Sequence, residues 1–271
     1  MADLPLLIEP EALKPLLDRA DLLVLDLCKD TTYQQLHLPG ALHMPYAEIV
    51  ASRHPTHGLL PLPDKLAQLF SAYGIGDTTH VVAYDDEGGG NACRLLWTLD
   101  AMGHSTYSLL NGGLHAWANE HHPVTRDKSS PQPTDFTPRP NPAPVAETAD
   151  ILQSLHREDL ALWDARSVNE YQGLSRFSQY PGHIPGAVNL DWLELMDREH
   201  NLRLKPEETL REMLGDLGIT PDKDVITYCQ THHRSSLSWF VLKYLGYERA
   251  RGYPGSWSDW GNRDDTPKET P

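Results

Sequence analysis

The sequence predicts an α/β protein built by tandem duplication, in which each half forms a mainly parallel sheet flanked by helices. Three observations support this prediction. Short apolar runs alternate with amphipathic, helix-like segments along the chain. The same landmarks occur twice in the same order, and a proline-rich stretch with little apolar periodicity separates the two copies. We therefore expect an N-terminal domain over residues 1–120, an extended linker over 121–146 and a C-terminal domain over 147–271.

The first copy begins with a predicted helix over residues 11–20, followed by a strand over 22–26 that ends on an aspartate. A Pro-Gly turn follows within residues 37–41. The later elements are a helix over 65–73 stopped by a glycine, a strand over 81–84, a glycine-rich loop, an amphipathic segment over 94–102, and an Asn-Gly-Gly turn leading into 114–117.

The second copy repeats five of these landmarks. They are a strand over 161–164 that again ends on an aspartate, a second His-Ile-Pro-Gly-Ala turn at 183–187, a helix over 210–217, a strand over 225–228 and a segment over 255–260 that matches 112–117. Residues 148–150 supply plausible capping residues for the first helix of this copy. The shared order indicates duplication of one βα-alternating unit.

Composition limits the functional classes. The chain has 271 residues, of which 39% are hydrophobic and 23% charged, as expected for a globular protein. No apolar run approaches the roughly 20 residues of a membrane span, and the first residues lack a secretory signal. We therefore expect a cytoplasmic protein with no membrane partner. The net charge of −15 argues against a nucleic-acid partner, because there is no basic surface to neutralise phosphates.

Cys229 is the candidate nucleophile. The three cysteines, Cys28, Cys93 and Cys229, are widely spaced and predict no disulfide framework. Cys229 follows the apolar strand over 225–228, and the six-residue turn Cys-Gln-Thr-His-His-Arg joins that strand to a helix. A turn this short tends to point its backbone N–H groups toward one centre, with the positive helix end behind it. Such an anion cradle stabilises a thiolate and lowers the pKa of the thiol.

The rest of the turn is predicted to bind the anion. It consists of Gln230, Thr231, His232, His233 and Arg234. Arg234 opens the helix and can hold the loop from behind or neutralise an oxyanion. The two histidines offer either a partly cationic rim for anionic substrates or plain solvent-exposed side chains. Because neighbours within one tight loop do not easily converge on one ion, we predict no metal.

Other residues are expected to support the loop or to mark the inactive copy. Asp164 and Arg166 end the strand over 161–164, and ligands gather at the carboxyl ends of parallel strands, so they either support the loop or form a structural pair. Trp257 is expected to be a core or interface aromatic near the same edge. In the first copy Asp85 takes the position of Cys229, and Cys93 falls inside the following helix. We therefore expect the first domain to be inactive.

At this point the chain resembles the two-domain rhodaneses, thiosulfate:cyanide sulfurtransferases, over almost its full length. The His-(Leu/Ile)-Pro-Gly-Ala turn of both copies looks like the first signature of that family. The segment Gly-Tyr-Pro-Gly-Ser-Trp-Ser-Asp-Trp at 252–260 looks like its C-terminal signature, with Asp259 where a glutamate is usual. The Asp-Ala-Arg triplet at 164–166 also fits. The loop is similar to that of a bacterial group of rhodaneses with the sequence Cys-Gln-Thr-His-His-Arg.

The resemblance implies a ping-pong reaction without cofactor or metal. The Cys229 thiolate would attack the outer sulfur of thiosulfate, release sulfite and carry a persulfide, which cyanide, a thiol or a protein acceptor then removes. The amides of residues 230–234 would stabilise the anionic sulfur. Two features depart from the family: the basic residues usually found directly after the cysteine are missing, and Glu170 stands where a substrate-binding arginine is usual. The internal duplication makes a monomer the expected state.

Three alternatives stay open. A 3-mercaptopyruvate sulfurtransferase shares the fold and the persulfide chemistry, but its loop typically starts Cys-Gly-Ser-Gly and arginines bind the substrate carboxylate; Arg176 is the one candidate here. A phosphatase of the related Cys-loop type has one more residue between cysteine and arginine, which gives a wider cradle. The third alternative is a binding module or a sulfur relay to a protein acceptor. An intact Cys229 argues against a binding module for the whole chain.

Overall fold

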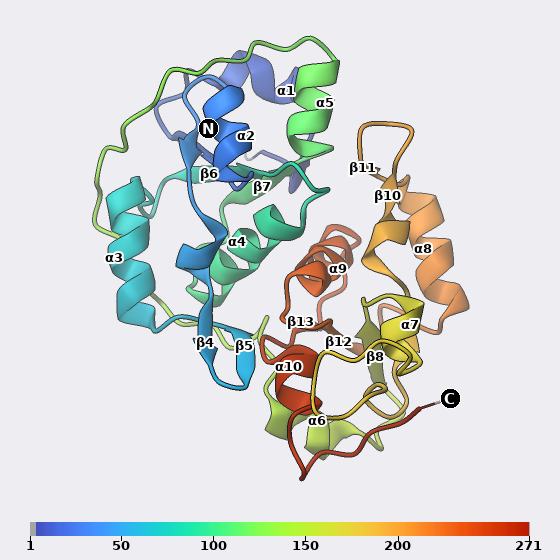
Figure 1. The fold of residues 1–271 in the computed structure, drawn as a ribbon. Coiled ribbons are helices and arrows are strands. Elements are labelled where there is room, and N and C mark those ends of the chain that lie inside the picture. Colours follow the sequence, from blue (N-terminus) through green and yellow to red (C-terminus); the bar gives the residue numbers. More distant parts are fainter. Residues whose placement is uncertain (1–3, 271) are drawn as a thin grey trace. The chain divides into compact units, whose positions relative to one another are not determined.

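The computed structural model describes residues 4–270, which form two compact units (Figure 1). Residues 1–3 and 271 lie outside the described part. They are the ends of the two predicted domains, and residues 1–3 belong to the segment in which a secretory signal would begin. Unit 1 contains the chain up to Ile49 together with Pro61–Pro140 and Met196–Leu204. Unit 2 contains Val50–Leu60, Asn141–Leu195 and the chain from Lys205. The boundaries 1–120, 121–146 and 147–271 follow the repeat along the sequence and stay a prediction of where each copy lies.

Unit 1 is built on a five-stranded parallel sheet with the order β1-β7-β6-β2-β3. Figure 1 shows α4 on one side of this sheet and α1, α2 and α5 on the other. The elements of unit 1 are β1 Leu7–Ile8, α1 Pro10–Leu13, the 3-10 turn η1 Lys14–Leu16, β2 Leu22–Asp26, α2 Asp30–Gln35, β3 Leu42–His43, the 3-10 turn η2 Tyr46–Ile49, α3 Pro63–Tyr73, β6 His80–Tyr84, α4 Gly90–Ala101, β7 Tyr107–Leu110, α5 Gly113–Asn119, β10 Met196–Asp197 and β11 Arg203–Leu204.

Unit 2 repeats this plan with a four-stranded parallel sheet of order β13-β12-β8-β9. Its central strand β12 is buried along its whole length. The elements of unit 2 are β4 Ala51–Arg53, β5 Thr56–Leu59, α6 Thr148–Ser154, β8 Leu160–Asp164, α7 Val168–Tyr171, β9 Val188–Asn189, the 3-10 turn η3 Trp192–Leu195, α8 Glu207–Asp216, β12 Asp224–Tyr228, α9 Arg234–Tyr244, β13 Ala250–Gly252 and α10 Ser256–Trp260.

The two parallel sheets and their flanking helices confirm the predicted fold class. The four strands predicted at 22–26, 81–84, 161–164 and 225–228 are all present. The helix predicted over residues 11–20 is wrong in length, because α1 ends at Leu13 and a 3-10 turn follows. Pro15 lies in that turn, and its missing N–H cannot continue an α-helical ladder.

Aromatic residues fill the core of both units on the side of the short helices. In unit 1, Tyr84 and Trp117 pack with the aliphatic residues of the sheet. In unit 2, Tyr228, Trp257 and Trp260 occupy the corresponding cluster. Burying such large side chains makes the cluster a main source of stability and fixes the strand end from which Cys229 emerges.

The proline-rich stretch over residues 121–146 contains no helix and no regular strand, and its first twenty residues attach to unit 1. Thr125 pairs through backbone hydrogen bonds with His37, and Thr134 donates its N–H to the carbonyl of Ser71. Phe136 is buried and packs edge-on against Phe70, with ring centroids 5.1 Å apart. These contacts anchor a segment that has no regular secondary structure of its own.

Each unit also contains a β-hairpin from the other half of the sequence. The β4–β5 hairpin comes from the first copy and belongs to unit 2, whereas the β10–β11 hairpin comes from the second copy and belongs to unit 1. Neither hairpin was predicted. Within residues 4–270, no helix combines the length and the apolar character that a membrane span requires.

Candidate active site

Cys229 is the first residue after β12, at the carboxyl end of the central strand of unit 2. Tyr228 pairs with Asp164, so the end of β8 lies beside it. The chain then turns through residues 230–233 before α9 begins at Arg234. His232 has a φ of 54°, a left-handed conformation that folds the loop back on itself. Strand, turn and helix are therefore arranged as the sequence predicts.

The Cys229 sulfur lies in a buried, electropositive environment. The residue is only 1% exposed. Burial alone would raise the pKa of the Cys229 thiol, but the positive charge of Arg234, the hydroxyl and N–H of Ser235 and the N–H of Thr231 together lower it to about 7. The thiolate is therefore well populated at neutral pH, which is what a sulfur nucleophile requires.

Arg234 is fixed by Glu170 in a bidentate ion pair. The two guanidinium N–H groups donate to the two carboxylate oxygens at 2.7 and 2.8 Å. The Ser167 hydroxyl donates to the same carboxylate at 2.8 Å, and the same two residues form the capping box of α7. Glu170, the departure noted from the sequence, therefore holds the cation that stabilises the Cys229 thiolate. A bidentate carboxylate–guanidinium pair fixes both distance and orientation.

The start of α10 holds the backbone of the loop. The Ser256 hydroxyl accepts the N–H of Cys229 at 3.2 Å and the N–H of His232 at 3.1 Å. The N–H groups of Trp257 and Ser258 donate to the carbonyls of Cys229 and Gln230, both at 2.9 Å. Four hydrogen bonds thus tie this segment, which resembles the family's C-terminal signature, to the loop.

Asp164 and Arg166 form a buried structural pair. Their side chains are joined by three hydrogen bonds of 2.5 to 3.0 Å. The Arg166 guanidinium also donates to the carbonyl of Gly182 at 2.8 Å and lies 4.6 Å from the centroid of a Trp257 ring. Of the two predicted roles, the geometry favours the structural pair, and Trp257 connects that pair to the loop.

The two histidines differ from each other. His232 is fully buried, and its Nδ1 lies 2.8 Å from the Ser235 hydroxyl oxygen. The expectation of a rim or of solvent exposure is therefore wrong for His232, because the left-handed backbone at this residue directs its side chain into the unit. His233 is half-buried and packs edge-on against Trp192, with centroids 5.6 Å apart.

Arg176 lies on a loop next to the active-site turn. The Gln230 side chain donates to the Ser178 hydroxyl at 3.1 Å, which joins the two segments. Arg176 itself is exposed, and its guanidinium donates to the carbonyls of Ser178 and Gln179 on its own loop. Substrate binding by Arg176 stays a prediction.

The loop of the first copy contains a cradle that its own side chain fills. The buried Asp85 carboxylate accepts the N–H groups of Glu87, Gly89 and Ala92 at 3.0, 2.8 and 2.9 Å. Gly90 occupies the position of Arg234, so the fixed cation is missing. Cys93 lies inside α4, as predicted, and burial raises the pKa of its thiol. This loop holds an internal anion and presents no nucleophile.

Several important residues were missed from the sequence. Ser235 donates hydrogen bonds to the Cys229 sulfur, and its place close after the predicted nucleophile was the available signal. Ser256 binds the loop backbone, and its place inside the signature segment was the available signal. The β4–β5 hairpin gave no such signal, because it lies about 170 residues before Cys229 in the chain.

Comparisons with known proteins agree with this geometry. The sequence matches the Rhodanese-like domain family over residues 9–120 and 147–263. A thiosulfate sulfurtransferase of Pseudomonas aeruginosa is 44% identical over 271 residues, which cover 99% of this chain and 98% of that protein. One of Azotobacter vinelandii is 42% identical over 268 residues, with coverage of 99% and 98%.

More distant relatives carry other names. The sulfur carrier protein TtuD of Thermus thermophilus is 37% identical over 212 residues, which cover 73% of this chain and 74% of that protein. A 3-mercaptopyruvate sulfurtransferase of Mus musculus is 29% identical over 233 residues, with coverage of 84% and 78%. An anaerobic ergothioneine biosynthesis enzyme of Chlorobium limicola has the same fold, with a TM-score of 0.87, 23% identity and coverage of 98% and 70%.

Proposed function

The chain belongs to the rhodanese-like domain family, and we propose that it is a thiosulfate sulfurtransferase in which Cys229 carries the transferred sulfur. The observation that carries the proposal is the Cys229 thiol, whose pKa is lowered to about 7 by Arg234, Ser235 and Thr231. The full-length similarity to two thiosulfate sulfurtransferases supports the choice of donor.

The reaction proceeds in two half-reactions. The Cys229 thiolate attacks the outer sulfur of thiosulfate, a sulfur–sulfur bond forms, and the original bond breaks as sulfite leaves with its electron pair. The cysteine now carries a persulfide anion. A thiophilic acceptor such as cyanide attacks the terminal sulfur, forms thiocyanate and regenerates the thiolate.

The cradle suits both anionic states of the sulfur. The N–H groups of Thr231 and Ser235 and the Ser235 hydroxyl favour negative charge on Cys229. A fixed set of donors of this kind stabilises developing negative charge without reorganising during the reaction. The charge of Arg234 adds a cation that Glu170 keeps in one place.

Two related functions are alternatives: mercaptopyruvate as the sulfur donor, and a protein as the sulfur acceptor. Mercaptopyruvate as donor would need a cation for its carboxylate, and Arg176 lies on a loop that contacts the active-site turn through Ser178. Similarity to a sulfur carrier protein supports the alternative that the sulfur is transferred to a protein acceptor. We favour thiosulfate, because the relatives with that name are more similar and cover nearly the whole chain.

We also propose a cellular compartment and an oligomeric state for the protein. All three cysteines are buried and unpaired, which agrees with the reducing cytoplasm expected from the sequence. The internal duplication leads us to propose a monomer.

The test is thiocyanate formation from thiosulfate and cyanide, with wild type beside Cys229→Ser and with Cys93→Ala as a matched control. We expect activity in the wild type and in Cys93→Ala and none in Cys229→Ser. Mass spectrometry after thiosulfate alone should show one added sulfur atom on the peptide that contains Cys229. A clear preference for mercaptopyruvate over thiosulfate would overturn the proposed donor, and activity in Cys229→Ser would overturn the proposed nucleophile.

A further inference from the structure

The β4–β5 hairpin packs against α10, the helix that holds the active-site loop. The hairpin is antiparallel, with Ala51 opposite Leu59 and Arg53 opposite Thr56. It belongs to unit 2 although it lies in the first copy of the sequence. Figure 1 shows β5 beside α10.

Hydrogen bonds connect the hairpin to α10. The N–H of His57 donates to the Ser258 hydroxyl at 3.0 Å, and that hydroxyl lies 2.9 Å from the carbonyl of His57. The N–H of Ser258 in turn donates to the carbonyl of Gln230. Ser258 therefore contacts the hairpin on one side and the active-site loop on the other.

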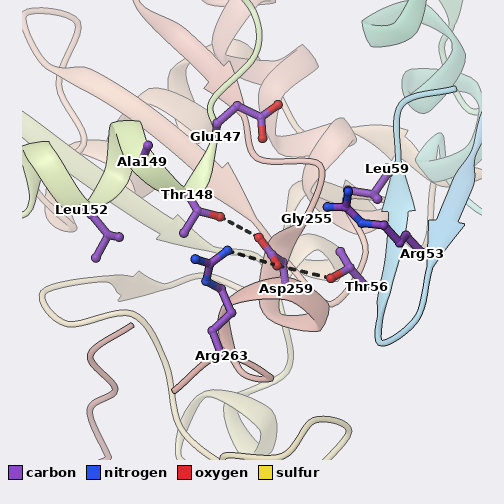
Figure 2. Close-up of a pocket in the computed structure, with 10 residues that line it drawn as sticks. All are labelled: Arg53, Thr56, Leu59, Glu147, Thr148, Ala149, Leu152, Gly255, Asp259 and Arg263. Atoms are coloured by element: carbon purple, nitrogen blue, oxygen red, sulfur yellow. Dashed lines mark hydrogen bonds and ion pairs between the residues drawn. The ribbon is translucent and has the colours of Figure 1, made fainter. Parts of the chain in front are cut away.

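Asp259 adds a second connection. Its carboxylate accepts hydrogen bonds from Thr56 at 3.2 Å, Thr148 at 2.6 Å and Tyr253 at 2.8 Å. Figure 2 shows Thr56 and Thr148 pointing at this carboxylate from opposite sides. Asp259 thus joins three elements of unit 2: the hairpin, α6 and α10.

The hairpin also contacts the active-site loop directly. Gly58 has a φ of +79°, and a Cβ atom built there would lie 2.0 Å from the carbonyl oxygen of Thr231. The two backbones are in such close contact that a side chain at residue 58 would displace Thr231. The N–H of Thr231 is one of the groups that stabilise the Cys229 thiolate.

We propose that the β4–β5 hairpin is a positioning element for the active-site loop. Gly58 fixes Thr231 directly, and Thr56 and His57 fix the neighbouring loop residues through α10. This inference rests on the proposed function only in that Cys229 is the nucleophile. None of the three residues is a catalytic residue. They act by keeping the donors of the cradle aimed at the sulfur.

Unit 1 contains the same arrangement. A Cβ atom at Gly88, in the loop that follows β6, would lie 2.0 Å from the sulfur of Met196 in the β10–β11 hairpin. A Cβ atom at Gly112 would lie 2.8 Å from the carbonyl oxygen of Asn201 in the same hairpin. In both units a hairpin from the other half of the chain abuts loops at the carboxyl end of the sheet, so this packing is a property of the duplicated fold.

The test compares Gly58→Ala with Gly40→Ala in the full-length protein. Gly40 has the same φ of +79°, but a Cβ atom there has nothing within 4 Å. Both variants carry the same backbone strain, and only Gly58→Ala pushes on Thr231. The readout is the pH dependence of iodoacetamide alkylation at Cys229, followed on its own peptide by mass spectrometry. This readout requires no sulfurtransferase turnover, so it stays informative even if thiosulfate is not the donor.

We expect the alkylation midpoint to rise by about one pH unit in Gly58→Ala, which lowers the rate at pH 7 about fivefold, and to stay unchanged in Gly40→Ala. Circular dichroism establishes that both variants are folded. Thr56→Val, which removes only the hydroxyl bound to Asp259, should shift the midpoint in the same direction by less and serves as the test if Gly58→Ala does not fold. Wild-type midpoints in folded Gly58→Ala, or in Thr56→Val if that variant must replace it, would overturn the proposal.

Discussion

At the scale of single residues, Cys229 shows how burial and reactivity are reconciled. Burial opposes the thiolate, yet Arg234, Ser235 and Thr231 lower the pKa of the thiol from 9.0 to about 7. A shift of this size corresponds to about 3 kcal/mol in favour of the charged form. Of these groups, only Arg234 carries a full charge, so it should account for much of the effect.

Replacing Arg234 by methionine should therefore raise the pKa of Cys229 by about one unit or more, because the sulfur loses its cation while the N–H donors remain. The measurement is the pH dependence of alkylation at Cys229, which should have a midpoint near pH 7 in the wild type. Arg211→Met is the matched control, since Arg211 pairs with Glu207 on the surface of α8. An unchanged midpoint in Arg234→Met would show that the hydrogen-bond donors of Ser235 and Thr231 lower the pKa of Cys229 without help from the cation.

Glu170→Gln removes the carboxylate charge that pairs with Arg234 and should change how stability depends on pH. The pKa of Glu170 is lowered because Arg234 and Ser167 outweigh the effect of burial, so the pair contributes stability at neutral pH that is lost as the pH falls toward the acidic range in which Glu170 is protonated. Glutamine keeps the shape but loses the bidentate charge pair. We expect a lower free energy of unfolding at pH 7, by about 1–3 kcal/mol, and a smaller loss at acidic pH. Urea denaturation at both pH values measures this, and an equal loss at both would contradict it.

At the scale of elements, the two loops show how one backbone design serves two purposes. In unit 2 the donors of the cradle act on the Cys229 sulfur, whereas in unit 1 they bind the Asp85 carboxylate. Burial and the neighbouring Glu87 raise the pKa of Asp85 to about 6, although three N–H donors act in the opposite direction. At neutral pH this carboxylate is therefore mostly ionised and works as an internal substitute for a bound anion.

A cysteine in the first loop should consequently remain unreactive. In the double variant Asp85→Cys, Cys229→Ser, burial and the nearby acidic residues favour the neutral thiol, and Gly90 supplies no cation. We expect alkylation at residue 85 to be at least about tenfold slower at pH 7 than at Cys229 in the wild type, with no thiocyanate formation. Comparable rates at the two positions would show that the turn alone, without the cation, suffices for activation.

The junction of α6, α10 and the hairpin gives a prediction about stability. Asp259→Asn replaces one of the two acceptor oxygens by an amide donor, which must face either the Thr56 hydroxyl or the hydroxyls of Thr148 and Tyr253. We expect the free energy of unfolding to fall by about 1–3 kcal/mol. Asp265→Asn is the control, because its carboxylate is 65% exposed and pairs with Arg263 at the surface. Equal urea midpoints for the two variants would argue against a structural role for Asp259.

The elements differ in how well the sequence predicts them. Strands such as β8 and β12 are apolar runs that recur in both copies, so pattern and repetition identify them. The β4–β5 hairpin has short, polar strands without a clear period, and its role depends on a contact with Thr231 far along the chain. Local patterns therefore identify Cys229 and its turn. They do not reveal the groups that three-dimensional packing brings to them from far along the chain, such as Gly58 and His57.

At the scale of the whole molecule, each unit includes a hairpin from the other half of the sequence, and we infer that the two halves depend on each other. Unit 2 includes residues 50–60, and unit 1 includes residues 196–204. A chain cut within the linker therefore leaves each fragment without one hairpin of its unit. Loss of the hairpin exposes α10 and removes the bonds from His57 and Thr56, so the cradle around Cys229 loses its outer support.

Splitting the chain tests this directly. We expect a fragment of residues 141–271 alone to be less stable than the full chain and to show a raised pKa of Cys229, because Gly58 no longer fixes Thr231. Co-expression with residues 1–140 should restore the low pKa and the proposed activity, since the hairpin then returns on the other fragment, and the two fragments should copurify. A matched co-expression in which the first fragment carries Gly58→Ala should restore stability better than reactivity. If residues 141–271 alone were alkylated at Cys229 with the wild-type midpoint, the hairpin would have no role in the cradle, and the exchange would be only a matter of packing.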